Sequence, residues 1–358
     1  MRALRGGRPW DYYAFTVAGM AALCTKDQAY GYLVLPALAI AWRAFAPRRG
    51  RGDAEPRPRT VVTMAGLVVA SVLVLQLAPV NPVGFVEHFR LITGPASQPF
   101  RTYPQTLAGH ALMARDAVWQ LGPTLSWPIF AIAAAAVAWA VWLRERGVLL
   151  LLLPVVSYYL TFIAVIGYHY DRFFIGVALI LCIIAGWAAD RAMAAGGPRR
   201  SAVAAVACAA VAFALWRAGS LDALMIRDSR YAAETWLRDN VGPRKTVAAT
   251  GMSQYLPRHV MVGWDPIPAS LDALRERERP PDYIVLNASF ALREPAGSIR
   301  AEFYRALREG REGYTLHRVF RTPLRFSPLA LEQRFREVRD DPQSNLSKIN
   351  PAIEIYAR

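Results

Sequence analysis

The sequence predicts a membrane all-α helical bundle followed by a small extracytoplasmic α/β domain. Apolar runs with charges between them fill the chain to about residue 219, and a mixed helix and strand pattern follows from Leu221. The overall hydrophobic content of 54% therefore averages over two unlike parts. We expect a transmembrane region over residues 1–219 and a soluble domain over residues 220–358.

Seven apolar segments are candidate transmembrane helices, because a helix of about 20 residues matches the ~30 Å hydrocarbon core of a bilayer. They cover residues 12–25, 30–46, 60–79, 123–143, 148–167, 172–190 and 201–219. The first two segments are short, and only the sequence TKDQA at 25–29 joins them. This pattern predicts a tight hairpin or a partly re-entrant pair of helices.

Basic residues between the spans predict the orientation. Before position 220 the chain has 20 basic and 9 acidic residues, so +11 of its net charge of +15 lies in the membrane part. Loops rich in Lys and Arg stay in the cytoplasm. The basic segments alternate with sparser ones and cover residues 2–8, 48–59, 144–146 and 191–200. We therefore expect a multi-pass inner-membrane protein with a cytoplasmic N-terminus, and we expect no nucleic-acid partner, because no recognition motif accompanies the charge.

On this topology the residues 167–174, with the sequence GYHYDRFF, lie outside the cytoplasm between the fifth and sixth spans. They place His169, Asp171 and Arg172 at a membrane boundary, where an ionised group needs water or a partner. Arg172 falls on the first turn of the next helix, an end that attracts anions, so with His169 and Tyr170 it predicts a phosphate site. The alternative is that Asp171 and Arg172 only snorkel and pair among the lipid headgroups.

The joint between the first two spans is a second candidate. A lysine there is too costly to keep in hydrocarbon, so Lys26 should face water or protein. If the second span begins near Tyr30, its N-terminus points outward, as does that of the span from Arg172. Two such ends, each with a cation, suit a lipid diphosphate or phosphodiester, with Asp27 and Gln28 lining the site. The alternative is an interfacial Lys26–Asp27 pair without a ligand.

The loop over residues 80–122 is too long for a plain connector. Residues 86–92 and 106–120 have amphipathic helical spacing and are predicted to lie along the membrane interface. Glu87 and His88 are possible site-lining residues, although the pattern favours ordinary interfacial packing for His88. No HExxH or Cys-rich spacing accompanies them, so no metal ligand is predicted. A divalent metal stays possible without a ligand motif, and no cofactor is firmly implied.

Helix and strand patterns alternate in the C-terminal part. Asp228 or Ser229 should cap a helix that continues to about Asn240. Further helices are predicted over 270–279 and 298–308, and strands over 245–250, 259–264, 282–287, 314–321 and 352–357. Residues 282–287 form a nearly continuous apolar run, typical of a sheet that is covered on both faces. No GxGxxG, P-loop or GxSxG motif is present, so this pattern gives no enzyme class.

Several short motifs carry a resemblance to a known family. The sequence LCTKDQAYGY at 23–32 resembles the Thr-Lys hairpin of bacterial membrane glycosyltransferases, and residues 169–174 resemble their aromatic-Arg-aromatic motif at the start of a late helix. Residues 228–237 and 255–258 look like the start of their periplasmic C-terminal domain. The family is the superfamily of protein O-mannosyltransferases and lipid A aminoarabinose transferases, with the C-type glycosyltransferase fold. The order of the motifs agrees over nearly the whole chain.

The resemblance implies transfer of a sugar from a polyprenyl-phosphate donor to an extracytoplasmic acceptor, either a protein or a lipid or glycan. In such enzymes an arginine like Arg172 contacts the lipid phosphate and a lysine like Lys26 lies near the donor. The expected partners are the donor, the acceptor and membrane lipids. The implied mechanism is a single displacement, in which a carboxylate deprotonates the acceptor while cations stabilise the departing phosphate.

Family members carry the catalytic acid in a first extracytoplasmic loop, whereas this chain enters the hairpin directly. Among the acids expected outside the cytoplasm in the membrane part, none matches that motif: Asp27, Glu87 and Asp171. The catalytic residue is therefore unknown, and the sequence predicts an N-terminally truncated form or one half of an enzyme. The alternative is a non-catalytic membrane protein with an extracytoplasmic binding domain. A transporter is disfavoured because the spans hold few polar residues and no inverted repeat.

Overall fold

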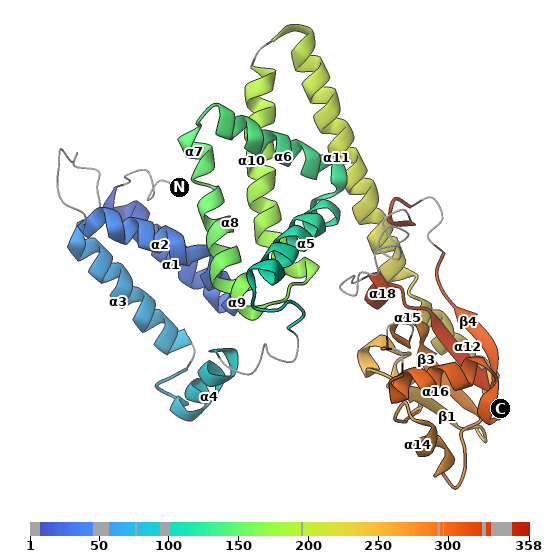
Figure 1. The fold of residues 1–358 in the computed structure, drawn as a ribbon. Helices are drawn as coiled ribbons and strands as arrows, with labels where there is room; N and C mark the ends of the chain where they lie inside the picture. The colour runs from blue at the N-terminus through green and yellow to red at the C-terminus, as the bar shows by residue number, and fades with distance from the viewer. Residues whose placement is uncertain are drawn as a thin grey trace. The chain divides into compact units, whose positions relative to one another are not determined.

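The computed structural model describes residues 8–45, 57–75, 77–93, 101–194, 196–291, 294–295, 297–323, 327–330 and 346–358. The chain divides into two compact units, Met1–Val211 and Ala212–Arg358 (Figure 1).

Helices make up the regular structure described in the first unit. They are α1 Pro9–Thr25, α2 Tyr30–Phe45, α3 Pro58–Leu75, α4 Pro82–Thr93, α5 Leu107–Leu125, α6 Trp127–Trp142, α7 Arg146–Leu149, α8 Leu152–Tyr158, α9 Ala164–Ile166, α10 Ile175–Met193 and α11 Gly197–Ile226. A π-helical turn, Tyr159–Ile163, joins α8 to α9, and 3-10 turns precede α2 (Asp27–Ala29) and α10 (Asp171–Phe174). Helix α11 runs past the boundary between the two units.

Three helical stretches are long and apolar enough to cross a membrane: Arg146–Ile166, Asp171–Met193 and Gly197–Asn240. Only 22%, 39% and 6% of their most apolar windows are buried, so most of these side chains face outward and suit a lipid environment. Helix α2, most of α3 and α6 are apolar but shorter. The described residues thus contain three membrane-length helices, which indicates membrane association. They do not support the predicted count of seven crossings.

The predicted span over 123–143 does not begin where the sequence placed it. Pro123 lies in the last turns of α5, the chain turns at Ser126 with φ of +71°, and α6 begins at Trp127. The apolar run is continuous through this corner, so hydropathy alone could not locate it. The two helices expected in the 80–122 loop are confirmed as α4 and α5, and Thr106 caps α5 by accepting a hydrogen bond from the Gly109 amide at 3.1 Å.

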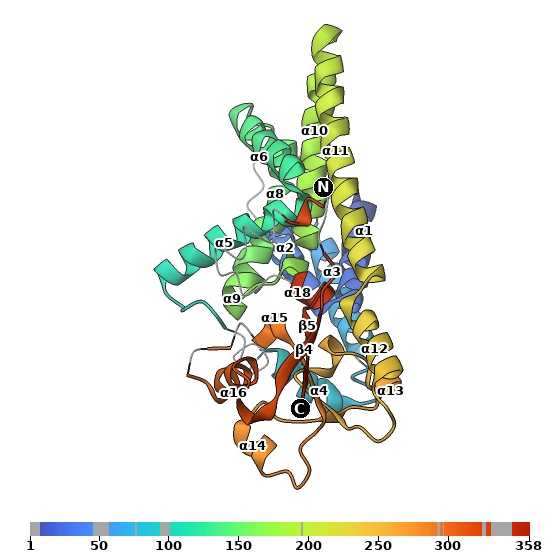
Figure 2. The ribbon, with the colours of Figure 1, turned by 90° about the vertical axis from the view of Figure 1, so that its right-hand side faces the viewer.

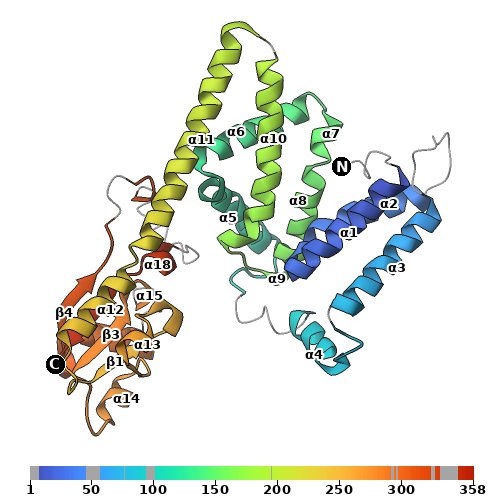
Figure 3. The ribbon, with the colours of Figure 1, turned by 180° about the vertical axis from the view of Figure 1, so that it is seen from behind.

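Two kinds of packing hold the first unit together. Aromatic and large aliphatic side chains from α5, α8, α10 and the turns Tyr159–Ile163 and Asp171–Phe174 form its main cluster, which includes Met113, Tyr158, Ile163 and Phe174. Small residues dominate between α6 and α10, where alanines let the two backbones approach closely, as in membrane helix pairs. Helices α1, α2 and α3 lie side by side (Figure 3).

The second unit contains a five-stranded sheet with the order β2-β1-β3-β5-β4. Its strands are β1 Val247–Thr250, β2 Asp265–Pro266, β3 Tyr283–Asn287, β4 Thr315–Phe320 and β5 Ile353–Ala357. Strands β1, β2 and β3 are parallel, and β5 is antiparallel to both β3 and β4. Figure 2 shows β4 and β5 side by side. Helices surround the sheet: α12 Ser229–Asn240, α13 His259–Val262, α14 Leu271–Arg275, α15 Ala288–Ala291, α16 Ile299–Arg308 and α18 Leu346–Ile349.

Both faces of the sheet are covered, as the apolar run at 282–287 predicted. Val285 on β3 packs in one cluster with Leu237 of α12. Ile284 and Leu286 point to the opposite face and pack in another cluster with Phe303 of α16. Side chains alternate along a strand, so a strand between two helical layers must be apolar at every position.

The prediction of a strand over 259–264 is wrong. Residues His259–Val262 form one turn of helix, which ends at Gly263 with φ of +70° and a Gly263 N–H to His259 oxygen bond of 2.7 Å. The side chain of Val260 is exposed, so its β-branched shape buries nothing. Local hydrogen bonds therefore decide the conformation here, and the strand starts two residues after the turn, at Asp265. The helix predicted over 270–279 is also shorter than expected, because α14 ends at Arg275.

Candidate functional site

Residues 167–174, called the boundary segment below, connect α9 to α10. Gly167 has φ of +70°, and its carbonyl accepts hydrogen bonds from the amides of Thr102 and Tyr103, both at 3.1 Å. A Cβ on Gly167 would lie 2.9 Å from Cγ of Arg101, so this position requires glycine for both its conformation and its space. The boundary segment is therefore fixed against the chain that leads into α5.

His169 lies at the centre of the boundary segment and is completely buried. Its Nδ1 is 2.9 Å from Oε1 of Gln120, and its Nε2 is 3.3 Å from the hydroxyl of Tyr103. The Tyr103 hydroxyl in turn donates to Oδ2 of Asp116 at 3.0 Å. Gln120, His169, Tyr103 and Asp116 thus form a continuous set of hydrogen-bonded side chains, called the polar chain below.

The polar chain restricts where its protons lie. The Tyr103 hydroxyl has one proton, and when Asp116 accepts it the Tyr103 oxygen must accept from Nε2–H of His169. Nδ1 of His169 donates to Oε1 of Gln120 or, after rotation of the amide, accepts from its nitrogen. The polar chain therefore links a buried imidazole to a carboxylate nearer the surface.

Asp116 forms the accessible end of the polar chain. Its side chain is half-buried, and its Oδ1 accepts from Nε of Arg115 at 2.9 Å while Oδ2 accepts from Tyr103. Sequence reasoning missed Asp116, Gln120 and Tyr103 as members of a site. The available signal was the spacing of Asp116 and Gln120, which lie one helical turn apart and so share a face of α5.

Arg172 lies on the 3-10 turn that opens α10, and its side chain is exposed. The guanidinium carbon is 5.0 Å from the ring centre of Tyr170 and 5.7 Å from that of Phe173. A cation over an aromatic face is held in place without using up its N–H donors. The structure thus presents a positioned arginine at the end of a membrane-length helical stretch.

The start of α2 lies beside the boundary segment. The Tyr32 hydroxyl donates to the carbonyl of Phe173 at 3.3 Å, and the Tyr32 ring stacks on Tyr158 at 4.0 Å between centres. The Tyr30 hydroxyl donates to the carbonyl of Thr161 at 3.1 Å. The helix that follows the Lys26 joint is therefore tied to the turn that carries Arg172.

Ser157 of α8 holds the same part of α2 in place. The Ser157 hydroxyl donates to the carbonyl of Gly31 and accepts from the amide of Leu35 at 3.0 Å, so it bridges the two ends of one helical i→i−4 pair. Pro36 follows directly, and a side chain inserted beside a proline is a common origin of a helix kink. Gly31 permits the close approach, because a Cβ there would lie 2.8 Å from the Tyr158 ring.

The other predicted site residues have fewer described contacts with the boundary segment. Lys26 is exposed at the C-cap of α1, Gln28 is half-buried in the turn Asp27–Ala29, and the side chain of Asp27 is outside the described residues. Within the described part of the chain, no hydrogen bond joins the Lys26 ammonium to the boundary segment. Asp171 lies half-buried in the turn that carries Arg172.

Glu87 and His88 both lie on α4, the first exposed and the second half-buried, and neither belongs to the polar chain. No group of three or more His, Cys, Asp or Glu residues is arranged to hold a metal ion in the part of the chain that the structure describes. The chain matches no protein-family model, no curated protein and no solved structure.

Proposed function

We propose that this protein transfers a glycosyl group from a polyprenyl-phosphate-linked donor to an extracytoplasmic acceptor, as a relative of the C-type membrane glycosyltransferases. The observation that carries the proposal is Arg172, which is exposed, held over Tyr170 and Phe173, and located where a membrane-length helical stretch begins. The phosphate of a lipid carrier lies at that depth, and a planar guanidinium binds phosphate oxygens in pairs. The seven-span topology with a cytoplasmic N-terminus belongs to this proposal.

The chemistry divides between the two parts of the site. An acceptor hydroxyl attacks the anomeric carbon of the sugar, and the bond from that carbon to the phosphate oxygen breaks. The electron pair of this bond goes to the lipid phosphate, whose charge Arg172 stabilises. The acceptor gives up its proton to a carboxylate. Lys26, on the joint before α2, is the second cation of the proposed donor site.

We assign the role of proton acceptor to Asp116. Its carboxylate is half-buried, and the polar chain connects it to His169, three residues before Arg172. Arg115 and Tyr103 each donate to one carboxylate oxygen, which orients the group. Asp116 would then take the role of the catalytic carboxylate, which family members carry in a first extracytoplasmic loop.

The second candidate function is a non-catalytic membrane protein with a binding domain. A cavity at the edge of the sheet in the second unit favours a binding role for that unit. The two functions differ in what the first unit does, because only the enzyme needs a phosphate site at Arg172.

Binding of a polyprenyl phosphate to the full chain in lipid nanodiscs, followed by native mass spectrometry, tests the proposal. Replacing Arg172 by Met keeps the apolar stem and removes the charge-assisted hydrogen bonds, so we expect binding to weaken about tenfold or more. Arg191→Met is the matched control, since Arg191 lies over Trp187 at 5.8 Å near the opposite end of α10. Equal binding by Arg172→Met and the unaltered chain would reject the phosphate site.

A further inference from the structure

The second unit holds a cavity at the carboxyl ends of its parallel strands. Its volume is about 300 Å³, and its walls come from the segments that follow β1, β2 and β3 and from α16. The chain leaves β1 toward β2, on one side, and leaves β3 toward the other side, where β5 and β4 lie. Ligands of open α/β sheets bind at this kind of switch point, outside the carboxyl ends of strands whose connections diverge.

The walls of the cavity are fixed by hydrogen bonds from the strand ends. Asn287, the last residue of β3, donates from Nδ2 to the carbonyl of Tyr255 at 3.1 Å and accepts at Oδ1 from the amide of Phe290 at 3.3 Å. The rings of Tyr255 and Phe290 stack with centres 4.9 Å apart. Asn287 is itself buried, so one amide side chain holds both aromatic walls in position.

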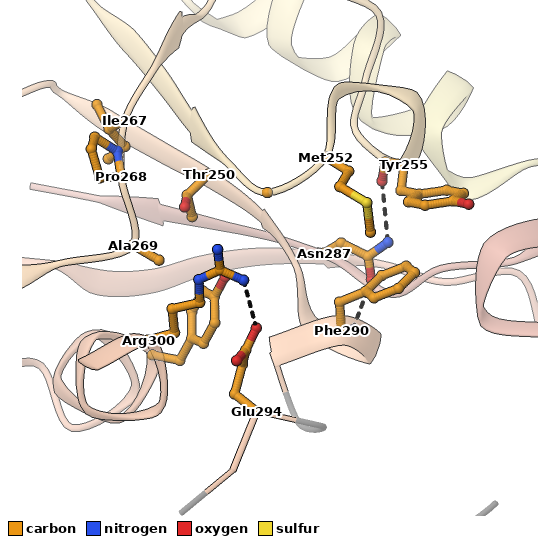
Figure 4. A pocket seen from close by; sticks show the side chains of 12 residues that line it. Thr250, Met252, Tyr255, Ile267, Pro268, Ala269, Asn287, Phe290, Glu294 and Arg300 are labelled. Carbon is orange, nitrogen blue, oxygen red and sulfur yellow. Dashed lines mark hydrogen bonds and ion pairs between the residues drawn. The ribbon is translucent and has the colours of Figure 1, made fainter. Parts of the chain in front are cut away.

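Two groups of opposite charge reach into the cavity from the α16 side. Figure 4 shows the Arg300 guanidinium pointing toward Thr250, with the Glu294 carboxylate beside it at 3.4 Å. Within the described residues this one contact leaves most of the five guanidinium donors and one carboxylate oxygen for a ligand. The Thr250 hydroxyl, at the end of β1, is buried and lies close to Tyr304, which also lines the cavity.

The composition of the walls selects the class of ligand. A cation paired with an anion gives the site donors and acceptors without a net charge, so it suits a neutral polyol better than an anion. Met252, Ile267, Pro268 and Phe290 supply apolar surface for the C–H face of a ring. A volume of about 300 Å³ is at the lower end for small-molecule sites, about 300–1,000 Å³. That size suits one or two sugar rings and not a lipid chain or a folded partner.

We propose that this cavity binds a saccharide, with Arg300 and Glu294 on neighbouring hydroxyl groups and with Phe290 and Met252 against the ring. The inference concerns the second unit alone, and it holds whether or not the first unit transfers sugar. A polar network that hydrogen-bonds hydroxyl groups discriminates well, because an analogue lacking a hydroxyl leaves buried polar groups without partners.

Saturation-transfer difference NMR on the full chain tests the proposal, in a detergent whose headgroup is not a sugar. The probes are the methyl pyranosides of glucose, galactose, mannose and N-acetylglucosamine, with methyl phosphate as the anionic probe. We expect at least one glycoside to receive saturation, and Arg300→Met to raise its dissociation constant by about tenfold or more. Arg238→Met is the matched control, since Arg238 is similarly exposed (60% against 67%) and pairs with Asp239 at 3.2 Å. Its dissociation constant should stay within about twofold, the range of a neutral surface substitution.

Three results would overturn the proposal: no glycoside binds, Arg300→Met leaves glycoside binding unchanged, or methyl phosphate binds while the glycosides do not. The exposure of Arg300 makes misfolding of the variant a minor concern, and circular dichroism checks it. Glu294→Gln is the second variant, and it should also weaken binding of the glycoside while leaving the fold intact. None of these measurements involves polyprenyl phosphate. A negative result for glycoside binding would therefore not bear on the proposed glycosyl transfer, which the polyprenyl phosphate binding experiment tests separately.

Discussion

The contact between His169 and Gln120 makes a quantitative prediction about the polar chain. Both side chains are buried, and their Nδ1 and Oε1 atoms are 2.9 Å apart. Removing one partner leaves the other buried without that hydrogen bond, at a cost of about 1–3 kcal/mol. We therefore expect His169→Phe and Gln120→Leu each to lower the free energy of unfolding by about that amount.

The double variant should be far less destabilised than the sum of the two. When both partners are replaced by apolar groups of similar shape, no buried polar atom is left without its hydrogen bond. Such double replacements change the stability little. Tyr103 keeps its bond to Asp116 in the double variant. The interaction energy of the cycle should therefore be about 1–3 kcal/mol in the compensating direction.

Unfolding in mixed micelles by a denaturing detergent, followed by circular dichroism, measures all four free energies. A control cycle combines Gln120→Leu with His88→Phe, because His88 lies on α4 and outside the polar chain. Its two effects should add within about 0.5 kcal/mol. Additivity in the His169 and Gln120 cycle would refute the claim that these two side chains satisfy each other.

Three further outcomes are expected. Ser157→Ala removes both hydrogen bonds to the Gly31–Leu35 turn of α2 and should lower the unfolding free energy by about 1–3 kcal/mol, measured by the same titration. Asp116→Asn should reduce the transfer rate by about 10²–10⁴-fold while polyprenyl phosphate binding stays unchanged, and a simultaneous loss of binding would count against the proton-acceptor role. Lys245 and a backbone amide hold the pKa of Asp282 at about 2, below its ordinary 3.8, so its ionised form stabilises the fold above that ordinary value. The difference in thermal midpoint between the unaltered chain and Asp282→Asn should therefore be largest near neutral pH and disappear as the pH falls toward 2.

Local patterns predicted much of the second unit. Asp228 caps α12 by accepting from the Arg230 amide at 2.9 Å, and the apolar run at 282–287 becomes the buried strand β3. Helix capping and an apolar strand both depend on residues that are neighbours in the sequence, so a short stretch of sequence is enough to predict them. The strand expected at 259–264 failed for the opposite reason, since its apolar residues found no partner strand and closed a helical turn instead.

The candidate site was only partly accessible to the same reasoning. Arg172 and His169 were found because they interrupt apolar spans, where a charged or polar residue is conspicuous. The polar chain was missed because its bonds join residues as far apart as Tyr103 and His169, and no periodicity connects them. Its acid, Asp116, lies on an ordinary amphipathic helix, where a carboxylate reads as a solvated surface group.

Transfer from a defined donor tests the central claim most directly. The full chain in nanodiscs is given polyprenyl-phosphate sugars labelled in the lipid, together with acceptors of both proposed classes, hydroxyl-bearing peptides and lipid glycans. The release of polyprenyl phosphate is followed by chromatography. The account predicts release by the unaltered chain, a loss of about 10²–10³-fold in Arg172→Met, and near-normal release in the Arg191→Met control. Release at the same rate in Arg172→Met, or no release from any polyprenyl-phosphate sugar, would contradict it.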